Sequence, residues 1–251
     1  NEWITNQKIS EPQVGEDGLS TVTITYKVSE AAGNRGGTIR IASADGSIAS
    51  DLSILQLEKD VKFVKFPDKN FKKFCLENNW ILSLSDDQCV VLETGLNATT
   101  LTNSSYYTQF VDLTGIENFP NLTTLNLGTC TDMKKMDISG LHKVSTLTFK
   151  YCNYCEVFDL GDNPILSFDA GGSYFESSSL QIISSVVETL NLRVTGYLQY
   201  YDQITSIDVS ECPALTTLNT DRGAKVKTLY LKTGQVIPNL TKNAATEIVY
   251  K

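Results

Sequence analysis

The chain has 251 residues, of which 41% are hydrophobic and 20% charged, enough to bury the core of one long domain or two smaller ones. The net charge of -8 argues against a nucleic-acid partner, whose phosphates would require clustered Lys and Arg. No apolar run approaches the roughly 20 residues that span a bilayer. Because Asn1 is not an initiator methionine, we expect a leader to have been removed or to be missing from this sequence.

Residues 1–58 have the alternation typical of β-strands. In the runs 20–29, 37–43 and 51–57, apolar side chains largely alternate with Thr, Ser, Lys and Arg. Gly, Asn and Asp turns separate these runs. The pattern predicts a small all-β, Ig-like sandwich domain that ends near residue 58.

A family resemblance in this segment depends on Trp3, on an Arg35-Gly36-Gly37 turn before a TIRI strand, and on the closing Gln56. With these residues the segment resembles the second half of the BACON module, a Bacteroidetes-associated domain often found ahead of secreted glycan-active proteins. The strands that precede the tryptophan in that module are absent, so either the domain begins before Asn1 or the sandwich is a reduced one. No binding residue of the module can be matched here.

Residues 59–100 predict a helical cap for the domain that follows. The segment 66–80 opens with Pro67-Asp68 and ends in Asn-Asn, which are helix start and stop signals. The run Ser85-Asp-Asp-Gln88 matches a capping box and predicts a second short helix. A cap with a polar outer face is what the exposed end of a solenoid requires.

Four phenylalanines are expected to form the core beneath this cap: Phe63, Phe66, Phe71 and Phe74. Cys75 and Cys89 would lie on the two facing helices. They could pair in an oxidising compartment, but the spacing alone does not decide whether they do.

Residues 101–251 repeat an LxxLxL pattern about every eleven residues, beginning with Leu122, Leu125 and Leu127. Two half-repeats make a coil of about 22 residues, which predicts a leucine-rich-repeat solenoid with parallel sheets. The second and third apolar residues of each half-repeat point inward because side chains alternate along a strand. One continuous sheet is expected to bury, in register, Leu125, Leu147, Phe168, Leu190 and Leu218. The other half-repeats form the opposite wall.

A second ladder is predicted at the corner after each first-wall strand. A small polar group turned inward there satisfies the backbone, and the residues at this place are Cys130, Cys152, Ser173 and Thr195. Cys152 and Cys155 also form a CxxC pair, but the repeat accounts for both and zinc would need further ligands. We therefore expect unpaired, inward-pointing thiols and no metal site.

The motif FPDKNFKKFCLENN, followed by LSDDQ and VDLTGIENFPNLTTLNL, resembles the cap and first repeats of Bacteroides-type, internalin-like surface leucine-rich-repeat proteins. The match covers about residues 65–251. The resemblance implies a secreted or outer-membrane surface location and an N-terminal lipid anchor. Relatives carry a DxDxDG calcium loop where this chain has NNWILSLSDD, so that calcium site is taken as lost.

The outward face of the first sheet is a candidate recognition surface. One file of short polar side chains contains Thr124, Thr146, Ser167, Thr189, Thr217 and Thr228. The file beside it contains Asn126, Thr148, Asp169, Asn191 and Asn219. Such ladders keep an exposed sheet soluble, and they would also serve recognition of a protein or glycan or form an ice-binding array.

Aromatic residues recur in the turns of successive coils: Tyr151, Tyr154, Tyr174, Phe175, Tyr197, Tyr200 and Tyr201, with Tyr106 and Tyr107 before them. Three of the tyrosines lie in residues 194–203, a surplus that the repeat does not need. They either pack over the edge of the coil or anchor a partner. The candidate binding residues are thus Tyr197, Tyr200, Tyr201, Tyr151 and Tyr174 in turns and Asn126, Thr148, Asp169 and Asn191 on the sheet.

Catalysis finds little support in the sequence. The single histidine, His142, falls in a connecting turn without a companion acid at an informative spacing. Asp137, Asp159 and Asp208 recur in the second wall, where we expect them to cap turns rather than to hold calcium. We predict no enzyme activity and no cofactor. The expected function is a non-catalytic cell-surface or secreted interaction protein that binds a protein or glycan; the alternative is a carbohydrate-binding component of a polysaccharide-uptake system.

Overall fold

The computed structural model describes residues 3–16, 20–30, 33–43, 45–47, 49–105 and 109–251. The chain divides into two compact units, Asn1–Phe63 and Val64–Lys251. It is mainly β, with parallel sheets that form a solenoid of about seven turns and with few helices. No helix among the described residues is long and apolar enough to cross a bilayer.

The first unit consists of antiparallel two-stranded ladders. They pair β1 (Ile4–Ile9) with β4 (Ile24–Val28), β2 (Gln13–Val14) with β3 (Ser20–Thr21), and β5 (Arg35–Ala42) with β6 (Ala49–Gln56). Its buried core is small and contains Ile4, Ile39 and Ile54. The Ig-like sandwich therefore stays a prediction.

The three residues that carry the BACON resemblance lie together in this unit. The guanidinium carbon of Arg35 lies 4.4 Å from the centre of the Trp3 ring, and its Nε donates to Gln56 Oε1 over 2.8 Å. The expected turn at Arg35-Gly36-Gly37 is wrong, because these residues begin β5 and pair with β6. The glycines continue the strand, and the arginine turns inward over the tryptophan.

The second unit begins with a cap in which one helix is as expected. α1 spans Lys69–Glu77, and Asp68 caps it by accepting hydrogen bonds from the backbone N–H groups of Asn70 and Phe71. Phe66, Phe71 and Cys75 are buried beneath it, Phe74 is partly buried, and Phe63 is exposed. Phe63 was therefore assigned wrongly to the core.

The second predicted cap helix is also wrong. β7 (Ile81–Ser85) and β8 (Gln88–Val91) form an antiparallel hairpin, and Asp86-Asp87 is its turn. The β-branched and apolar residues on both sides outweigh the local capping signal. Helix α2 (Glu93–Leu96) follows instead. Cys89 lies on β8 and Cys75 on α1, and both are buried free thiols.

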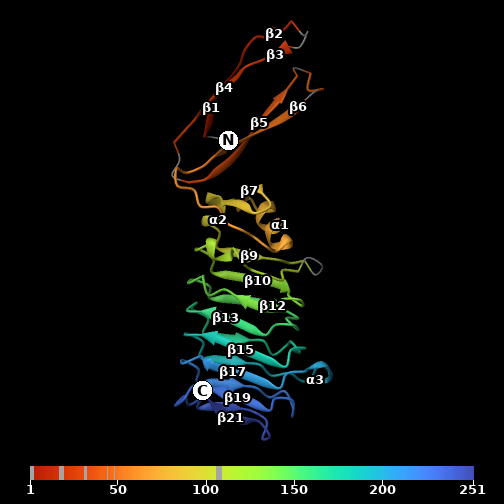
Figure 1. Ribbon diagram of the computed structural model, residues 1–251, viewed down its shortest axis with the longest axis vertical. Helices are drawn as coiled ribbons and strands as arrows, with labels where there is room; N and C mark the ends of the chain where they lie inside the picture. Colours follow the sequence, from red (N-terminus) through yellow and green to blue (C-terminus); the bar gives the residue numbers. More distant parts are fainter. Residues whose placement is uncertain (1–2, 17–19, 31–32, 44, 48, 106–108) are drawn as a thin grey trace. The chain divides into compact units, whose positions relative to one another are not determined.

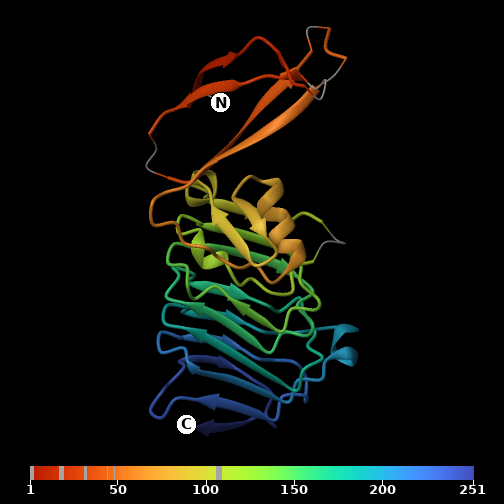
Figure 2. The same cartoon turned by 45° about the horizontal axis from the view of Figure 1, so that its top comes forward.

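The rest of the chain winds into coils with a strand on each of two walls (Figures 1 and 2). The first wall contains β9 (Thr100–Thr102), β10 (Thr124–Thr129), β12 (Thr146–Lys150), β14 (Ser167–Asp169), β16 (Thr189–Asn191), β18 (Thr217–Asn219) and β20 (Asn239–Thr241). The second wall contains β11 (Lys135–Asp137), β13 (Val157–Gly161), β15 (Ser179–Ser184), β17 (Ser206–Glu211), β19 (Thr228–Leu231) and β21 (Glu247–Tyr250). The short helices η1 (Ile116–Asn118) and α3 (Leu198–Tyr201) interrupt the coils. The predicted leucine-rich-repeat type is corrected: the coils form a β-solenoid and not a typical leucine-rich repeat, since both walls are parallel β-sheets.

The second wall is one six-stranded parallel sheet, whereas the first wall is divided. β9, β10 and β12 form one sheet and β14, β16, β18 and β20 another, so the expected continuous sheet is wrong. Leu125, Phe168, Leu190 and Leu218 are buried as predicted, but Leu147 on β12 is only half-buried. Thr228 is also corrected, since it pairs with Ser206 in the second wall.

The division coincides with a concentration of aromatic rings in the core. Phe158 lies 5.4 Å from Phe149, 5.2 Å from Phe168 and 6.3 Å from Phe175, measured between ring centres. Most other inward first-wall positions hold leucine, which is smaller. We attribute the break to the larger volume that these rings occupy between β12 and β14, because a close-packed core transmits volume changes to its backbone.

Candidate functional site

The corner that follows each first-wall strand is lined as expected in its early coils. Cys130, Cys152 and Ser173 are all buried. The Cys130 thiol lies 3.7 Å from the carbonyl oxygen of Leu127, which it caps. Burial, together with the neighbouring Cys130 thiol, raises the pKa of Cys152 well above its usual value. Both thiols are free, as predicted.

The ladder ends one coil earlier than the sequence indicates. Thr195, the next predicted member, is exposed, and its neighbour Val194 is buried instead. The side chain that fills this part of the corner is Arg222, which is fully buried. Sequence reasoning missed it because a buried arginine is rare unless it is paired.

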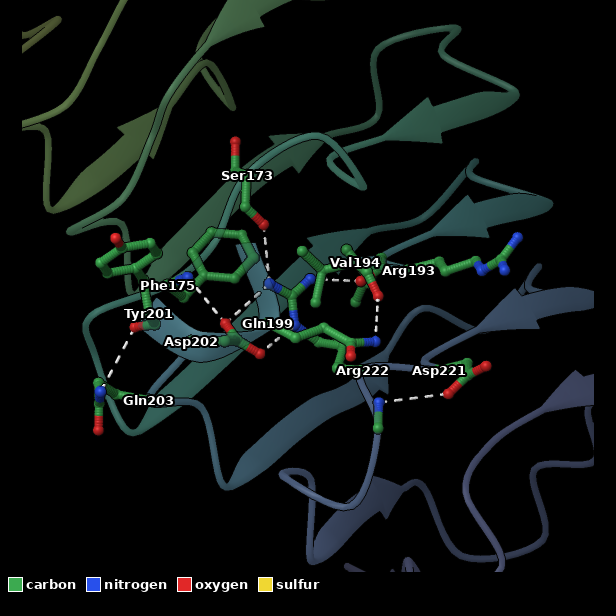
Figure 3. A network of polar contacts seen from close by, with 12 residues as sticks. Ser173, Phe175, Arg193, Val194, Gln199, Tyr201, Asp202, Gln203, Asp221 and Arg222 are labelled. Atoms are coloured by element: carbon green, nitrogen blue, oxygen red, sulfur yellow. Dashed lines mark hydrogen bonds and ion pairs between the residues drawn. The ribbon is translucent and has the colours of Figure 1, made fainter. Parts of the chain in front are cut away.

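Arg222 is held by four groups (Figure 3). Its Nε donates to Asp202 Oδ2 and its Nη2 to Asp202 Oδ1, both over 2.8 Å, in a two-pronged ion pair. Nη2 also donates to the Ser173 carbonyl over 2.7 Å, and Nη1 donates to the Leu192 carbonyl. The Phe175 ring centre lies 4.8 Å from the guanidinium carbon. The arginine thus takes over the role of the ladder at this corner.

Asp202 neutralises the buried guanidinium of Arg222 and also accepts a hydrogen bond from the backbone. Its Oδ1 accepts from the Phe175 N–H over 2.8 Å, in addition to the bond from Arg222. Removing the two charges from water costs several kcal/mol per ion. The ion pair offsets this cost only when its geometry is good and the remaining polar atoms are hydrogen-bonded. Here the pair joins successive coils, since Phe175, Leu192 and Arg222 belong to different turns.

The surplus residues 194–203 begin and end at this buried pair. Val194 and Asp202 are buried, and the segment between them carries α3, which projects beyond the stack of strands (Figure 1). Gln199 holds the base of the loop, because its Nε2 donates to the Val194 carbonyl over 2.9 Å. The interpretation that the surplus has no part in closing the corner is therefore wrong for Asp202.

The loop tyrosines do not cover the core. Tyr197 is 72% exposed, Tyr200 82% and Tyr201 57%. Of the three, only Tyr201 has a described ring partner, Tyr174, with 5.5 Å between the ring centres. Packing over the coil edge therefore does not account for Tyr197 and Tyr200.

The other turn tyrosines lie on neighbouring coils of the same edge. The Glu176 N–H donates to the Asn153 carbonyl and the Gln203 N–H to the Phe175 carbonyl, which stacks these turns. A hydrogen bond to the Glu176 carboxylate raises the pKa of Tyr154, and partial burial together with Glu176 raises that of Tyr174. Tyr106 and Tyr107 lie outside the described residues.

Tyr151 belongs to a separate cleft at the break in the first wall. It has a left-handed φ of 54° and is exposed. The cleft measures about 300 Å³ and is lined by Phe149, Lys150, Tyr151, Asp169, Ala170, Gly172 and Ser173. Thr148 is exposed on β12, the strand that Tyr151 follows. The structure therefore separates Tyr151 and Asp169 from the tyrosines of the projecting loop.

In the outward file that begins with Asn126, most polar side chains form hydrogen bonds within their own turns. Asn126, Asp169 and Asn191 each accept a hydrogen bond from the backbone N–H two residues later. Asn191 also donates to Asp169 Oδ2 over 3.1 Å. These contacts account for the recurrence of Asn and Asp at this position without a ligand.

A groove runs beside the projecting loop. It measures about 600 Å³ and is lined by Gly196, Tyr197, Gln199, Tyr200, Arg222, Gly223, Ala224 and Lys225. A groove of this size lies within the range of small-molecule sites. It brings together two tyrosines of the loop and a turn of the following coil, which are more than 20 residues apart in sequence. The sequence signal that could have indicated this site is an arginine beside the ladder position, one coil after a surplus that contains an aspartate.

The acidic and titratable groups elsewhere form local contacts. Asp137 and Asp208 each accept from the N–H and hydroxyl of the serine two residues later, so they cap their own turns. His142 contacts Asp162 over 2.6 Å at the surface. Among the described residues, no three His, Cys, Asp or Glu side chains are placed to hold a metal ion.

Comparison with known proteins adds no family to this geometry. No protein-family model matches the chain, and no curated protein matches it.

Proposed function

We propose that this protein is a non-catalytic binding protein of the cell surface or the secreted fraction. The β-solenoid serves as a rigid support, and the tyrosine loop at residues 194–203 makes the main contact with the partner. A BACON-like first domain, an N-terminal lipid anchor and the surface location belong to the proposal and rest on the family resemblances alone.

The observation that carries the proposal is the contrast between the base of the loop and its tip. The base is fastened by a buried two-pronged ion pair between Arg222 and Asp202, while Tyr197 and Tyr200 stand in solvent. Tyrosine gives a large contact area at little conformational cost, and such residues dominate binding surfaces. A prefixed loop also loses little entropy when a partner binds.

The test replaces Tyr197 and Tyr200 with alanine together. A partner-binding loop predicts a melting temperature nearly equal to that of the wild type, and binding weakened by about 1 to 4 kcal/mol. Tyr250→Ala is the matched control, because Tyr250 is an exposed tyrosine on the second wall. Binding is measured on a glycan array and by pull-down from host mucosal extract.

A drop of several degrees in the melting temperature of the double variant would show that the tyrosines stabilise the coil edge. Equal loss of binding in Tyr250→Ala would show that the loss is not specific to the loop. Either result ends the case for this loop as the binding site.

A second candidate function is a carbohydrate-binding component of a polysaccharide-uptake system. The groove beside the loop favours it, because the groove combines two tyrosine rings with the amide of Gln199 and the backbone of Gly223. Aromatic faces stack on the C–H faces of sugars, and the polar groups bind hydroxyls.

A further inference from the structure

The groove beside the tyrosine loop carries an unbalanced charge. Of its lining residues, Arg222 and Lys225 are charged. Arg222 is neutralised by Asp202, but Lys225 is exposed and has no hydrogen bond or ion pair among the described residues. Asp221, the nearest acid in sequence, accepts from the Gly223 N–H over 3.3 Å and does not contact Lys225. The groove therefore presents one free ammonium group.

This local charge is opposite in sign to that of the whole chain, which has a net charge of -8. Elsewhere several surface lysines lie against carboxylates, as Lys135 does with Asp137 and Lys251 with Asp208. An unpaired ammonium in a concave site favours an anionic ligand, because a concave wall of lower dielectric than water strengthens the attraction.

The aromatic lining limits the kind of anion. Tyr197 and Tyr200 offer exposed ring faces that a small inorganic ion would leave uncovered. A volume of about 600 Å³ suits a chain of a few rings. A carboxylated sugar chain supplies C–H faces for the tyrosines, hydroxyls for Gln199 and a negative charge for Lys225.

We propose that this groove binds an acidic glycan, with sugar rings stacked on Tyr197 and Tyr200 and a uronate carboxylate paired with Lys225. The inference rests on the proposed binding function of the loop and specifies its ligand class. The Gln199 Nε2 donates to the Val194 carbonyl and fixes the base of the loop, which leaves its Oε1 to accept from a sugar hydroxyl.

The experiment measures binding of the full chain to an oligogalacturonate and to a neutral galacto-oligosaccharide of equal length by calorimetry. We expect the acidic chain to bind more tightly, and the difference to fall as NaCl is raised. Lys225→Gln should lower affinity for the acidic chain by about threefold to fivefold, as an exposed ion pair would, and should leave the neutral chain unaffected. Lys232→Gln, at an exposed lysine outside the groove, is the matched control.

A third variant separates failure of the inference from failure of the proposed function. Tyr197→Ala with Tyr200→Ala should weaken both oligosaccharides by about tenfold or more. If Lys225→Gln leaves both affinities unchanged while the tyrosine variant loses binding, the preference for an acidic ligand is rejected and the binding function of the loop is supported. If neither oligosaccharide binds the wild type, the acidic-glycan inference is rejected. The pull-down with the tyrosine variant then tests whether the loop binds a partner. If the tyrosine variant binds both as well as the wild type does, the loop is overturned as well.

Discussion

Two corners on the same edge of the solenoid are filled by side chains of different chemistry. At Cys130 and Cys152, small neutral thiols fill the corner, one residue for each coil. At Arg222, a charged side chain from a later coil crosses to meet Asp202 and the carbonyls of Ser173 and Leu192. In the first solution each coil supplies its own corner residue. The second leaves the intervening residues free to project, which is how the tyrosine loop leaves the stack.

The two corners also differ in how much their stability depends on hydrogen-bonding and charged partners. A buried thiol stays neutral because burial raises its pKa, so it needs no partner. A buried guanidinium cannot lose its proton and must keep every partner. The thiol corner should therefore tolerate substitution better than the ion-paired corner, and the following predictions are ordered by the expected effect.

Arg222→Met should have the largest effect. It leaves the Asp202 carboxylate buried without its counter-charge, which typically costs about 3–5 kcal/mol. Urea unfolding followed through the solenoid transition measures this loss. Arg193→Met, at an exposed arginine on the same edge, should stay within about 0.5 kcal/mol of the wild type. A loss below about 1 kcal/mol in Arg222→Met would mean that the pair does not hold the corner.

Replacing both partners should be milder than replacing one. In Arg222→Met with Asp202→Leu, no charge stays buried, but the carbonyls of Ser173 and Leu192 lose their donor. We expect a loss of about 1–3 kcal/mol, less than in Arg222→Met alone. The double-mutant cycle gives the coupling directly. Additive single losses would contradict the interpretation of the two residues as one unit.

Cys152→Ala should cost less again, about 1–2 kcal/mol, since it removes one sulfur atom from a packed site and leaves no charge behind. The same urea assay measures it, with Ser145→Ala as an exposed control on the same coil. A cost as large as that of Arg222→Met would remove the proposed difference between the corners.

The smallest effect is expected at alkaline pH. Burial raises the pKa of Cys155 and of Cys212 from 9.0 to about 12. The unfolded chain ionises these thiols first, so their contribution is intact below pH 9 and is lost as the pH rises toward 12. At pH 10 the loss should be about 1 kcal/mol per thiol. The decline in unfolding free energy between pH 9 and 10 should be shallower in Cys212→Ala, and an identical slope would contradict this assignment.

The sequence by itself determined the solenoid, the inward register of most of its apolar residues and the thiol corner. These depend on alternation along a strand and on a coil length that recurs, both of which are local properties repeated many times. Leu125, Leu190 and Cys152 could be placed inside because each is positioned by its own coil.

Only the tertiary structure decided the rest, which depends on strand pairing in the cap and on side chains that meet across coils. The hairpin at Ser85–Gln88 forms because two apolar strands pair there, against a local helix signal. The break in the first wall coincides with contacts among phenylalanines from neighbouring coils. Arg222 is buried because Asp202, 20 residues away, reaches it. The ion pair and the ring contacts join residues of different coils, so the repeat pattern of one coil does not predict them.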